Sequence, residues 1–396
     1  MIGASICRGT GATEPWPNPD QEATQGQVEF LYAYAPERIP GGPLTGGMWR
    51  YRELLPIADG EILYPMPIGG TPLLAPPALR RETGLAHLYL KDETRGPTGS
   101  NKDRATALVL ERALRSGIKT VSCASTGNVA TSLAVGAAAA GLQAVVFVPE
   151  EVNPAKLRLM LLAGARVLKV REGYAAAFRI SREAAKAFGW LDRNTGVNPA
   201  TLEAKKTVAF EIWEQLGRRM PDVVVAPIGD GPTLSALAKG FRELVLCGVA
   251  SRVPRIIGVQ AEGCQPVKRI LDEDSPLEPI VPDTLADGIA VGAPVSASMV
   301  VREVRESGGS VLALPDEAFL EAIGVLAQRA GVLAEPAGAA AFAGLLRATS
   351  LGLVAREETV VALVTGTGLK TPDFLRPVLG AHTIGADLSE VEQALR

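Results

Sequence analysis

The chain has 396 residues, of which 47% are hydrophobic and 21% charged, and its formal net charge is -3. A chain of this length and composition buries enough apolar surface to fold without disulfides or metal ions, and it predicts two domains or one large domain with an insertion. The slightly acidic balance disfavours a nucleic-acid-binding protein, because such proteins present a basic face.

Histidine and cysteine are too sparse for several kinds of site. With two histidines in the chain, histidine acid–base chemistry and His-rich metal sites have no support. The four cysteines form no CxxC pair, so we expect neither a disulfide framework nor a metal site. No basic segment followed by an apolar core opens the sequence, and a cytoplasmic location is therefore expected.

Strand and helix patterns alternate along most of the chain. Residues 1 to about 45 are rich in Gly, Pro and Thr and predict a loose N-terminal arm. From Thr120 onward, short Val-rich runs alternate with helical patterns, which is typical of βαβ units and parallel sheets. We expect strands at 120–125, 144–150, 166–170, 222–229, 255–262 and 359–368, and helices at 103–114, 128–141, 155–165, 175–189 and 234–244. The predicted fold class is α/β with parallel sheets.

One apolar stretch, from Leu133 to Val148, approaches the length of a membrane span. It contains Gly141 and Gln143 and changes from Ala-rich to Val-rich at that point. A buried helix, a glycine stop and a buried strand explain this pattern better than a membrane helix.

Two loops in the first half of the chain lie where α/β folds place ligands. In GPTGSNKDRAT (96–106), small turn-forming residues flank Lys102 and let a bulky group approach, although a lysine at a helix start is usually a solvated charge. In STGN, the side chains of Ser125, Thr126 and Asn128 cap the following helix, or the loop holds a carboxylate or a cofactor oxygen.

Two further loops follow Val-rich strands in the second half of the chain. The first contains Gly229, Asp230, Gly231, Pro232 and Thr233, and it is either a plain strand-to-helix turn or a phosphate site made by backbone amides and the helix dipole. It matches neither a P-loop nor a dinucleotide fingerprint. In the second, LVTGTGLK (363–370), the hydroxyl of Thr365 is a candidate turn cap.

In this combination and order the loops resemble those of the fold type II pyridoxal-phosphate (PLP) enzymes, and of the threonine synthases among them. GPTGSNKDR is similar to PTGSFKDR, and TGTGLK to TGxGLK, while STGN and GDGPT stand where the family has its asparagine loop and its phosphate loop. MWRYRELLP, GGTPLL, LYLKDE, ADGIAVG and AEPAGAAAFAGL also resemble family segments, so the resemblance runs from about Met48 to Pro372.

The resemblance implies a role for each loop. Lys102 would carry PLP as a Schiff base and remove the Cα proton of the substrate. Asn128 would bond the phenolic oxygen of the cofactor, and Thr365 its ring nitrogen. The loop from Gly229 to Thr233 would hold the cofactor phosphate, and Ser125, Thr126 and Gly127 the substrate carboxylate.

The resemblance also implies two parallel-sheet domains with the cofactor in the cleft between them. We expect an N-terminal arm at 1–47, a large PLP domain at 48–97 and 173–385, a small α/β domain at 98–172 and a C-terminal tail at 386–396.

This sequence departs from the family pattern near the expected substrate. Asn101 precedes Lys102 where the family has phenylalanine, and Thr201 replaces an arginine that the resemblance assigns to the substrate phosphate. Loss of a bidentate phosphate partner is not conservative. Lys205, in place of a glutamine, and Asn194 remain as candidate substrate residues. Asp230 adds a carboxylate to the phosphate loop, which is tolerable where its side chain points away, and Pro232 removes one amide donor.

The resemblance implies a cytoplasmic, homodimeric PLP lyase that converts O-phosphohomoserine and water into threonine and phosphate. The departures leave open threonine or serine ammonia-lyase activity and a cysteate synthase-like replacement on phosphoserine. A non-catalytic homologue that binds PLP or an amino acid is a remoter alternative, which the presence of Lys102 disfavours. The expected partner is a small amino-acid substrate, with no nucleic acid and no membrane.

Overall fold

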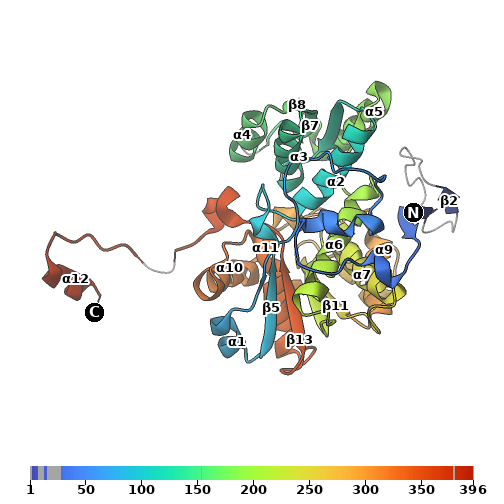
Figure 1. Ribbon diagram of the computed structural model, residues 1–396. Helices are drawn as coiled ribbons and strands as arrows, with labels where there is room; N and C mark the ends of the chain where they lie inside the picture. The colour runs from blue at the N-terminus through green and yellow to red at the C-terminus, as the bar shows by residue number, and fades with distance from the viewer. Residues whose placement is uncertain (1, 8–12, 16–27, 153, 378–379, 396) are drawn as a thin grey trace.

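Two sheets of mainly parallel strands, with helices packed on them, form the body of the protein (Figure 1). The computed structural model describes residues 2–7, 13–15, 28–152, 154–377 and 380–395. The larger sheet has six strands in the order β12-β11-β10-β13-β5-β4, all parallel except β4. The strands are β4 (Leu73–Leu74), β5 (His87–Asp92), β10 (Val223–Pro227), β11 (Arg255–Ala261), β12 (Ser310–Leu314) and β13 (Thr359–Val364). The predicted parallel α/β fold is therefore present.

Helices cover both faces of this sheet. Along β10, Val223 and Val225 face a core shared with α10 and α11, while Val224 and Ala226 face a core shared with α6, α7 and α9. This alternation buries every residue of the strand, which explains why its sequence is a continuous apolar run. These helices are α6 (Ala200–Gln215), α7 (Pro232–Leu246), α9 (Ala297–Glu306), α10 (Asp316–Ala330) and α11 (Pro336–Ser350).

The smaller sheet has four parallel strands in the order β8-β7-β6-β9. Its strands are β6 (Thr120–Ala124), β7 (Gln143–Pro149), β8 (Arg166–Val170) and β9 (Leu191–Asp192). The helices that accompany it are α2 (Lys102–Arg115), α3 (Asn128–Ala139), α4 (Pro154–Leu162) and α5 (Gly173–Phe188). The unit around this sheet thus extends beyond the boundary predicted at residue 172, because α5 packs on it and β9 pairs with β6.

The predicted loose arm contains regular structure. Strands β1 (Ile2–Cys7), β2 (Thr13–Pro15) and β3 (Val28–Tyr32) form an antiparallel sheet. Phe30 and Tyr32 are buried in the core that contains α6 and α7, and the amine of Lys239 donates to the carbonyl of Phe30 (2.7 Å). The prediction of a loose arm is therefore wrong for β3, whose aromatic side chains anchor it. Residues 8–12 and 16–27 of that arm lie outside the described residues.

The apolar stretch from Leu133 to Val148 divides as expected into the end of α3, a turn and β7. Gly141 takes a left-handed conformation (φ 67°) in that turn. Within the described residues, every helix falls short of the length and apolarity that a bilayer crossing requires. The predicted C-terminal tail contains α12 (Leu388–Ala394) and extends away from the body (Figure 1).

Helices α1 (Pro77–Thr83) and α8 (Pro266–Glu273) lie beside the large sheet. The described residues also contain six short 3-10 helices, which are η1 (Pro36–Arg38), η2 (Gly47–Leu54), η3 (Glu93–Arg95), η4 (Asp287–Ile289), η5 (Gly368–Lys370) and η6 (Pro372–Phe374). Of these, η3, η4 and η5 supply residues that contact the loops described next.

Candidate active site

The lysine loop lies against the loop that follows β13. Lys102 is the first residue of α2, and the backbone N–H of Asn101 donates to the carbonyl of Thr365 (2.9 Å). The N–H of Thr367 donates to the carbonyl of Gly99 (2.8 Å). Two segments that lie far apart in the sequence, the lysine loop and the loop after β13, are thus joined by backbone hydrogen bonds. These bonds place Thr365 beside the lysine loop.

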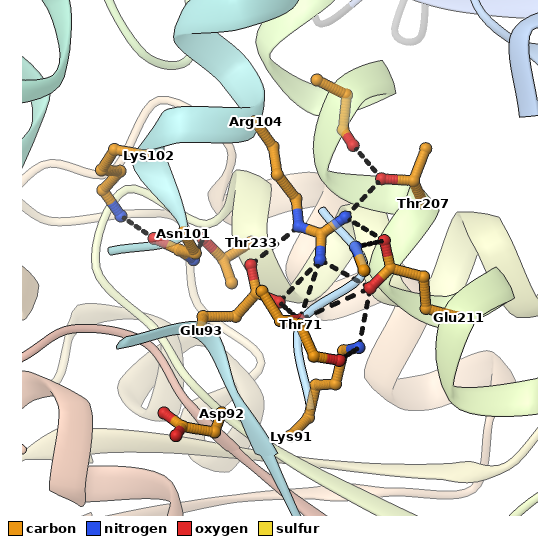
Figure 2. Close-up of polar contacts among 12 residues, drawn as sticks. Thr71, Lys91, Asp92, Glu93, Asn101, Lys102, Arg104, Thr207, Glu211 and Thr233 are labelled. Atoms are coloured by element: carbon orange, nitrogen blue, oxygen red, sulfur yellow. Dashed lines mark hydrogen bonds and ion pairs between the residues drawn. The ribbon is translucent and has the colours of Figure 1, made fainter. Parts of the chain in front are cut away.

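The side chain of Asn101 connects the same lysine to the glycine loop. The Nζ of Lys102 donates to Oδ1 of Asn101 (3.1 Å), and Nδ2 of Asn101 donates to Oγ1 of Thr233 (3.3 Å) (Figure 2). Asn101, which departs from the family pattern, is therefore the residue that orients the amine. Burial lowers the pKa of Lys102 to about 8, although the nearby Glu335 carboxylate opposes this shift. An amine with this pKa is partly neutral near pH 7, as a nucleophile or a base requires.

Asn128, the first residue of α3, brings the STGN loop to the same place. Its Nδ2 donates to Oε1 of Glu335 (2.6 Å), and its Oδ1 accepts from the amine of Lys370. Lys370 also donates to the carbonyl of Thr98 (2.8 Å) in the lysine loop. The amide of Asn128 is thus oriented by one acceptor and one donor. Glu335 is buried, and this raises the pKa of its carboxyl.

The rest of the STGN loop lies between β6 and α3. The hydroxyl of Ser125 accepts from the N–H of Gly127 (3.2 Å), as a turn cap does. Ser125, Thr126 and Gly127 are partly exposed. This bond closes a turn within the loop and does not cap α3, whose N-cap Gly127 has no side-chain cap hydrogen bond, so the predicted helix cap is absent. The hydroxyl proton of Ser125 remains available to a carboxylate.

The glycine loop needs glycine for steric reasons. Gly231 takes a positive φ of 101°, and a Cβ there would lie 2.7 Å from Cβ of Ser296. Pro232 is the first residue of α7, where its missing N–H costs nothing, because helix-start amides lack an internal partner. The N-terminal turn of this 15-residue helix therefore faces the loop with its amides and the positive end of its dipole.

The carboxylate of Asp230 is directed at neighbouring backbone. Its Oδ1 accepts from the N–H of Val295 (2.8 Å), and its Oδ2 lies 2.4 Å from the position that a Cβ on Gly196 would take. Burial raises the pKa of Asp230 to about 7, while the Val295 amide and the Lys205 amine lower it. The hydrogen bond from Val295 holds the side chain, and its direction toward Gly196 meets the condition for tolerating a carboxylate in this loop.

The three residues that the sequence places near the substrate differ in their surroundings. The side chain of Asn194 accepts from the N–H of Ala124 (2.8 Å) and donates to Oγ of Ser181 (3.0 Å), so it supports the end of β6. The hydroxyl of Thr201 donates to the carbonyl of Asn198 (2.8 Å). Lys205, one turn further along α6, is buried, and its Nζ has no hydrogen-bond partner within the described residues.

An ion cluster that the sequence did not reveal lies behind the lysine (Figure 2). Arg104 forms paired hydrogen bonds to Glu93 (2.7 and 2.7 Å) and to Glu211 (2.6 and 2.7 Å). Lys91 donates to the same Glu211 carboxylate (2.7 Å). The cluster joins α2 to η3 and α6, and thereby fixes the helix that begins at Lys102. Arg104 belongs to the KDR motif, which was its only signal in the sequence.

Arg193, Glu335 and Lys370 were also missed. Glu335 and Lys370 lie inside the segments AEPAGAAAFAGL and TGTGLK, so those motifs carried the available signal. Arg193 is fully buried, and one of its donors bonds the carbonyl of Lys102 (3.3 Å). Nothing in the sequence around Arg193 distinguishes it from a surface arginine.

The residues present fit PLP, the cofactor that the sequence implies. An amine with a lowered pKa and a helix start with free amides match an aldehyde and a phosphate. Within the described residues, the hydroxyls of Ser100 and Ser235 and the amine of Lys205 are buried without a hydrogen-bond partner. Ser100 precedes the Asn101–Lys102 pair and Ser235 lies in the first turn of α7, so partnerless polar groups occur in both segments.

Comparisons with known proteins agree with this geometry. Residues 64–366 match the family described as pyridoxal-phosphate dependent enzyme. The chain is 37% identical over 358 residues to the threonine synthase of Methanocaldococcus jannaschii, with 88% of each chain covered. It is 38% identical over 333 residues to the threonine synthase of Mycobacterium tuberculosis, covering 84% of this chain and 90% of that one.

A solved structure shows the same fold. The L-serine ammonia-lyase from Rhizomucor miehei superposes with a TM-score of 0.66 at 22% identity, covering 75% of this chain and 93% of that chain. The predicted fold class and cofactor are thus confirmed. The chain belongs to the pyridoxal-phosphate dependent enzyme family, is similar to the threonine synthases, and takes pyridoxal phosphate as its cofactor.

Proposed function

We propose that the chain is a threonine synthase-like lyase that converts O-phosphohomoserine and water into threonine and phosphate. The observation that supports this most is the meeting of four sequence-distant segments around Lys102. They contribute Asn101, Asn128, Thr233 and Thr365, in a chain whose relatives are threonine synthases over most of its length.

PLP, when bound, supplies an electron sink for the carbanion that forms at the substrate Cα. In our proposal Lys102 would hold the cofactor through its Nζ, and the same amine would move the Cα proton, for which its lowered pKa is suited. The loop from Gly229 to Thr233 would hold the cofactor phosphate, and Asn128 and Thr365 would orient the ring through its phenolic oxygen and its nitrogen. Ser125, Thr126 and Gly127 bind the substrate carboxylate.

The neutral hydroxyl of Thr365 influences which reaction the cofactor would support, because it affects the protonation of the ring nitrogen. Its hydrogen bond to the carbonyl of Ala337 is long (3.4 Å), so it can turn to a ring nitrogen at little cost. A hydroxyl leaves a pyridine nitrogen largely unprotonated, whereas a carboxylate would hold a proton there. We infer that this favours expulsion of a β or γ leaving group over transamination.

A second candidate is elimination or replacement on another hydroxy or phospho amino acid. Thr201 favours it, because this residue is 1% exposed and its hydroxyl is already bonded within the start of α6. The position offers no cation to a phosphate leaving group. Serine, threonine and phosphoserine are therefore the substrates to compare with phosphohomoserine.

We also propose a homodimer located in the cytoplasm and a two-domain organisation with the site between the domains. The placement of Lys102, Asn128 and Thr365 between the two sheets supports the last point. Sedimentation of the purified protein tests the oligomeric state.

The first prediction concerns Lys102. Borohydride reduction and peptide mapping should find the pyridoxyl group on Lys102, and Lys102→Ala should lose turnover while the exposed-site control Lys119→Ala keeps it. Phosphate and ammonia release from phosphohomoserine, phosphoserine, serine and threonine then identify the reaction. A pyridoxyl group on another lysine would refute the assignment, and ammonia without phosphate would favour the second candidate.

A further inference from the structure

Lys205 carries a buried amine that has no hydrogen-bond partner within the described residues. The residue is 2% exposed. Burying an ammonium group without a partner is costly, so a native site of this kind requires an explanation. The other buried lysines of α6 and α7, Lys206 and Lys239, show the contrast, since both are paired with Glu203 at 2.6 Å.

The charges around Lys205 are mainly positive. Burial lowers the pKa of Lys205 well below its usual value, the positive charges of Lys102 and Arg193 lower it further, and the Asp230 carboxylate opposes them. Asp230 is occupied by the Val295 amide and directed at Gly196. The hydrogen bonds of Arg193 run to neutral oxygens, namely Oγ1 of Thr106 (3.0 Å), Oγ1 of Thr195 (3.0 Å) and the carbonyl of Lys102 (3.3 Å). The region therefore favours an added anion.

The other donors at the start of α6 are already engaged. The N–H groups of Ala200 and Thr201 donate to Oδ1 and the carbonyl of Asn198 (3.0 Å each), and the Thr201 hydroxyl donates to that carbonyl as well. The amide of Asn194 is held between Ala124 and Ser181. In this group, Lys205 is thus the side chain whose donor atom has no hydrogen-bond partner within the described residues.

We infer that Lys205, with Arg193 beside it, forms an anion subsite next to Lys102 that takes a phosphomonoester group. The inference rests on the proposed function, and it deepens it by naming a residue that recognises a phosphorylated substrate in place of position 201. A phosphomonoester dianion offers several strong acceptors to an ammonium donor, and such charge-assisted bonds are among the strongest in a site. The cofactor carries the same chemical group, so the experiment separates the two sources.

The test compares Lys205→Met, which removes the charge and retains length, with the control Lys205→Arg, which retains the charge. One arm titrates cofactor-free protein with PLP. The other arm uses calorimetry on the holoenzyme to measure the binding of two ligands. One is a phosphonate analogue of phosphohomoserine, and the other is 2-aminobutyrate, which lacks the phosphonate. Thermal unfolding checks that each variant is folded.

For a substrate subsite we expect Lys205→Met to weaken phosphonate binding roughly ten- to hundredfold. Binding of 2-aminobutyrate and of PLP should stay within about threefold of wild type, and Lys205→Arg should recover most of the phosphonate affinity. A loss confined to PLP binding would support the anion subsite with the cofactor phosphate as its occupant.

Unchanged binding of both ligands in Lys205→Met, with normal folding, would overturn the inference. Failure of wild-type holoenzyme to bind either amino-acid ligand is a different result. It would refute the proposed function. The titration of cofactor-free wild type and Lys205→Met with PLP would then decide whether Lys205 binds a phosphate group.

Discussion

At the scale of single residues, the charge of Asp230 depends on its surroundings in the glycine loop. Its pKa is raised to about 7, mainly by burial, although the Val295 N–H bonds its Oδ1. A folded-state pKa above the ordinary value near 4 means that the folded protein holds this proton more tightly than the unfolded chain. Asp230 therefore lowers stability as pH rises from about 4 to about 7, and the cost is fully present above that range.

Asp230→Asn should remove this dependence. The amide oxygen of asparagine can still accept from Val295, so the contact is retained and the charge is lost. We expect cofactor-free Asp230→Asn to gain stability relative to wild type at pH 8 but not at pH 4. Urea unfolding of both proteins at the two pH values measures the difference. An equal difference at both values would show that the carboxyl titrates normally.

At the scale of elements, the ion cluster around Arg104 connects four of them, namely α2, η3, α6 and β5. Arg104 on α2 pairs with Glu93 of η3 and Glu211 of α6. Lys91 of β5 also pairs with Glu211, so the cluster consists of two cations and two carboxylates. All four side chains are almost fully buried. Since α2 begins at Lys102 and α6 carries Lys205, the cluster sets the spacing of the two lysines of the site.

Arg104→Met should be strongly destabilising. It leaves two buried carboxylates with one lysine, and removing one partner of a buried ion pair typically costs about 3–5 kcal/mol. The double variant with Glu93→Gln, which also removes one carboxylate charge, should recover part of that loss. Urea unfolding measures both variants. A loss below about 1 kcal/mol in the single variant would mean that the cluster contributes little to stability.

These elements also show what the sequence could and could not predict. β10 was predictable because both faces of the strand are buried, which makes its sequence a continuous apolar run. β9 was not, because two residues carry no periodicity, and its pairing with β6 extends the small sheet past residue 172. The four loops were predictable from local motifs. The Arg104–Glu211 pair was not, because its partners are 107 positions apart.

At the scale of the whole molecule, side chains from both sheets meet at the site. Asn128 and Lys156 belong to helices of the small sheet, and they bond Glu335 and Asp287 from the large one. Lys370 bonds both Asn128 and the Thr98 carbonyl. The site residues are therefore also the contacts that hold the two units together, so a change in spacing between the units changes the geometry around Lys102.

Strand β3, near the N-terminus, makes a further long-range contact with α6. The hydroxyl of Tyr32 donates to Oε2 of Glu203 (2.8 Å), 171 positions away, within a buried group that includes Lys206 and Lys239. Tyr34, which follows β3 in the chain, makes a weaker contact of the same kind, a 3.2 Å hydrogen bond to Glu243 that is only part-buried. The two tyrosines thus form a matched pair for measuring how much this segment contributes.

Tyr32→Phe should destabilise the protein by about 1–3 kcal/mol, because it leaves a lone pair of a buried carboxylate without its donor. Tyr34→Phe should cost about 0.5–1.5 kcal/mol or less, since water can replace a part-buried donor. Urea unfolding with an unchanged slope would show that β3 unfolds together with the two sheets. Equal losses in the two variants would instead mean that burial of Glu203 does not set the cost, and a lowered slope in Tyr32→Phe would mean that β3 detaches before the rest unfolds.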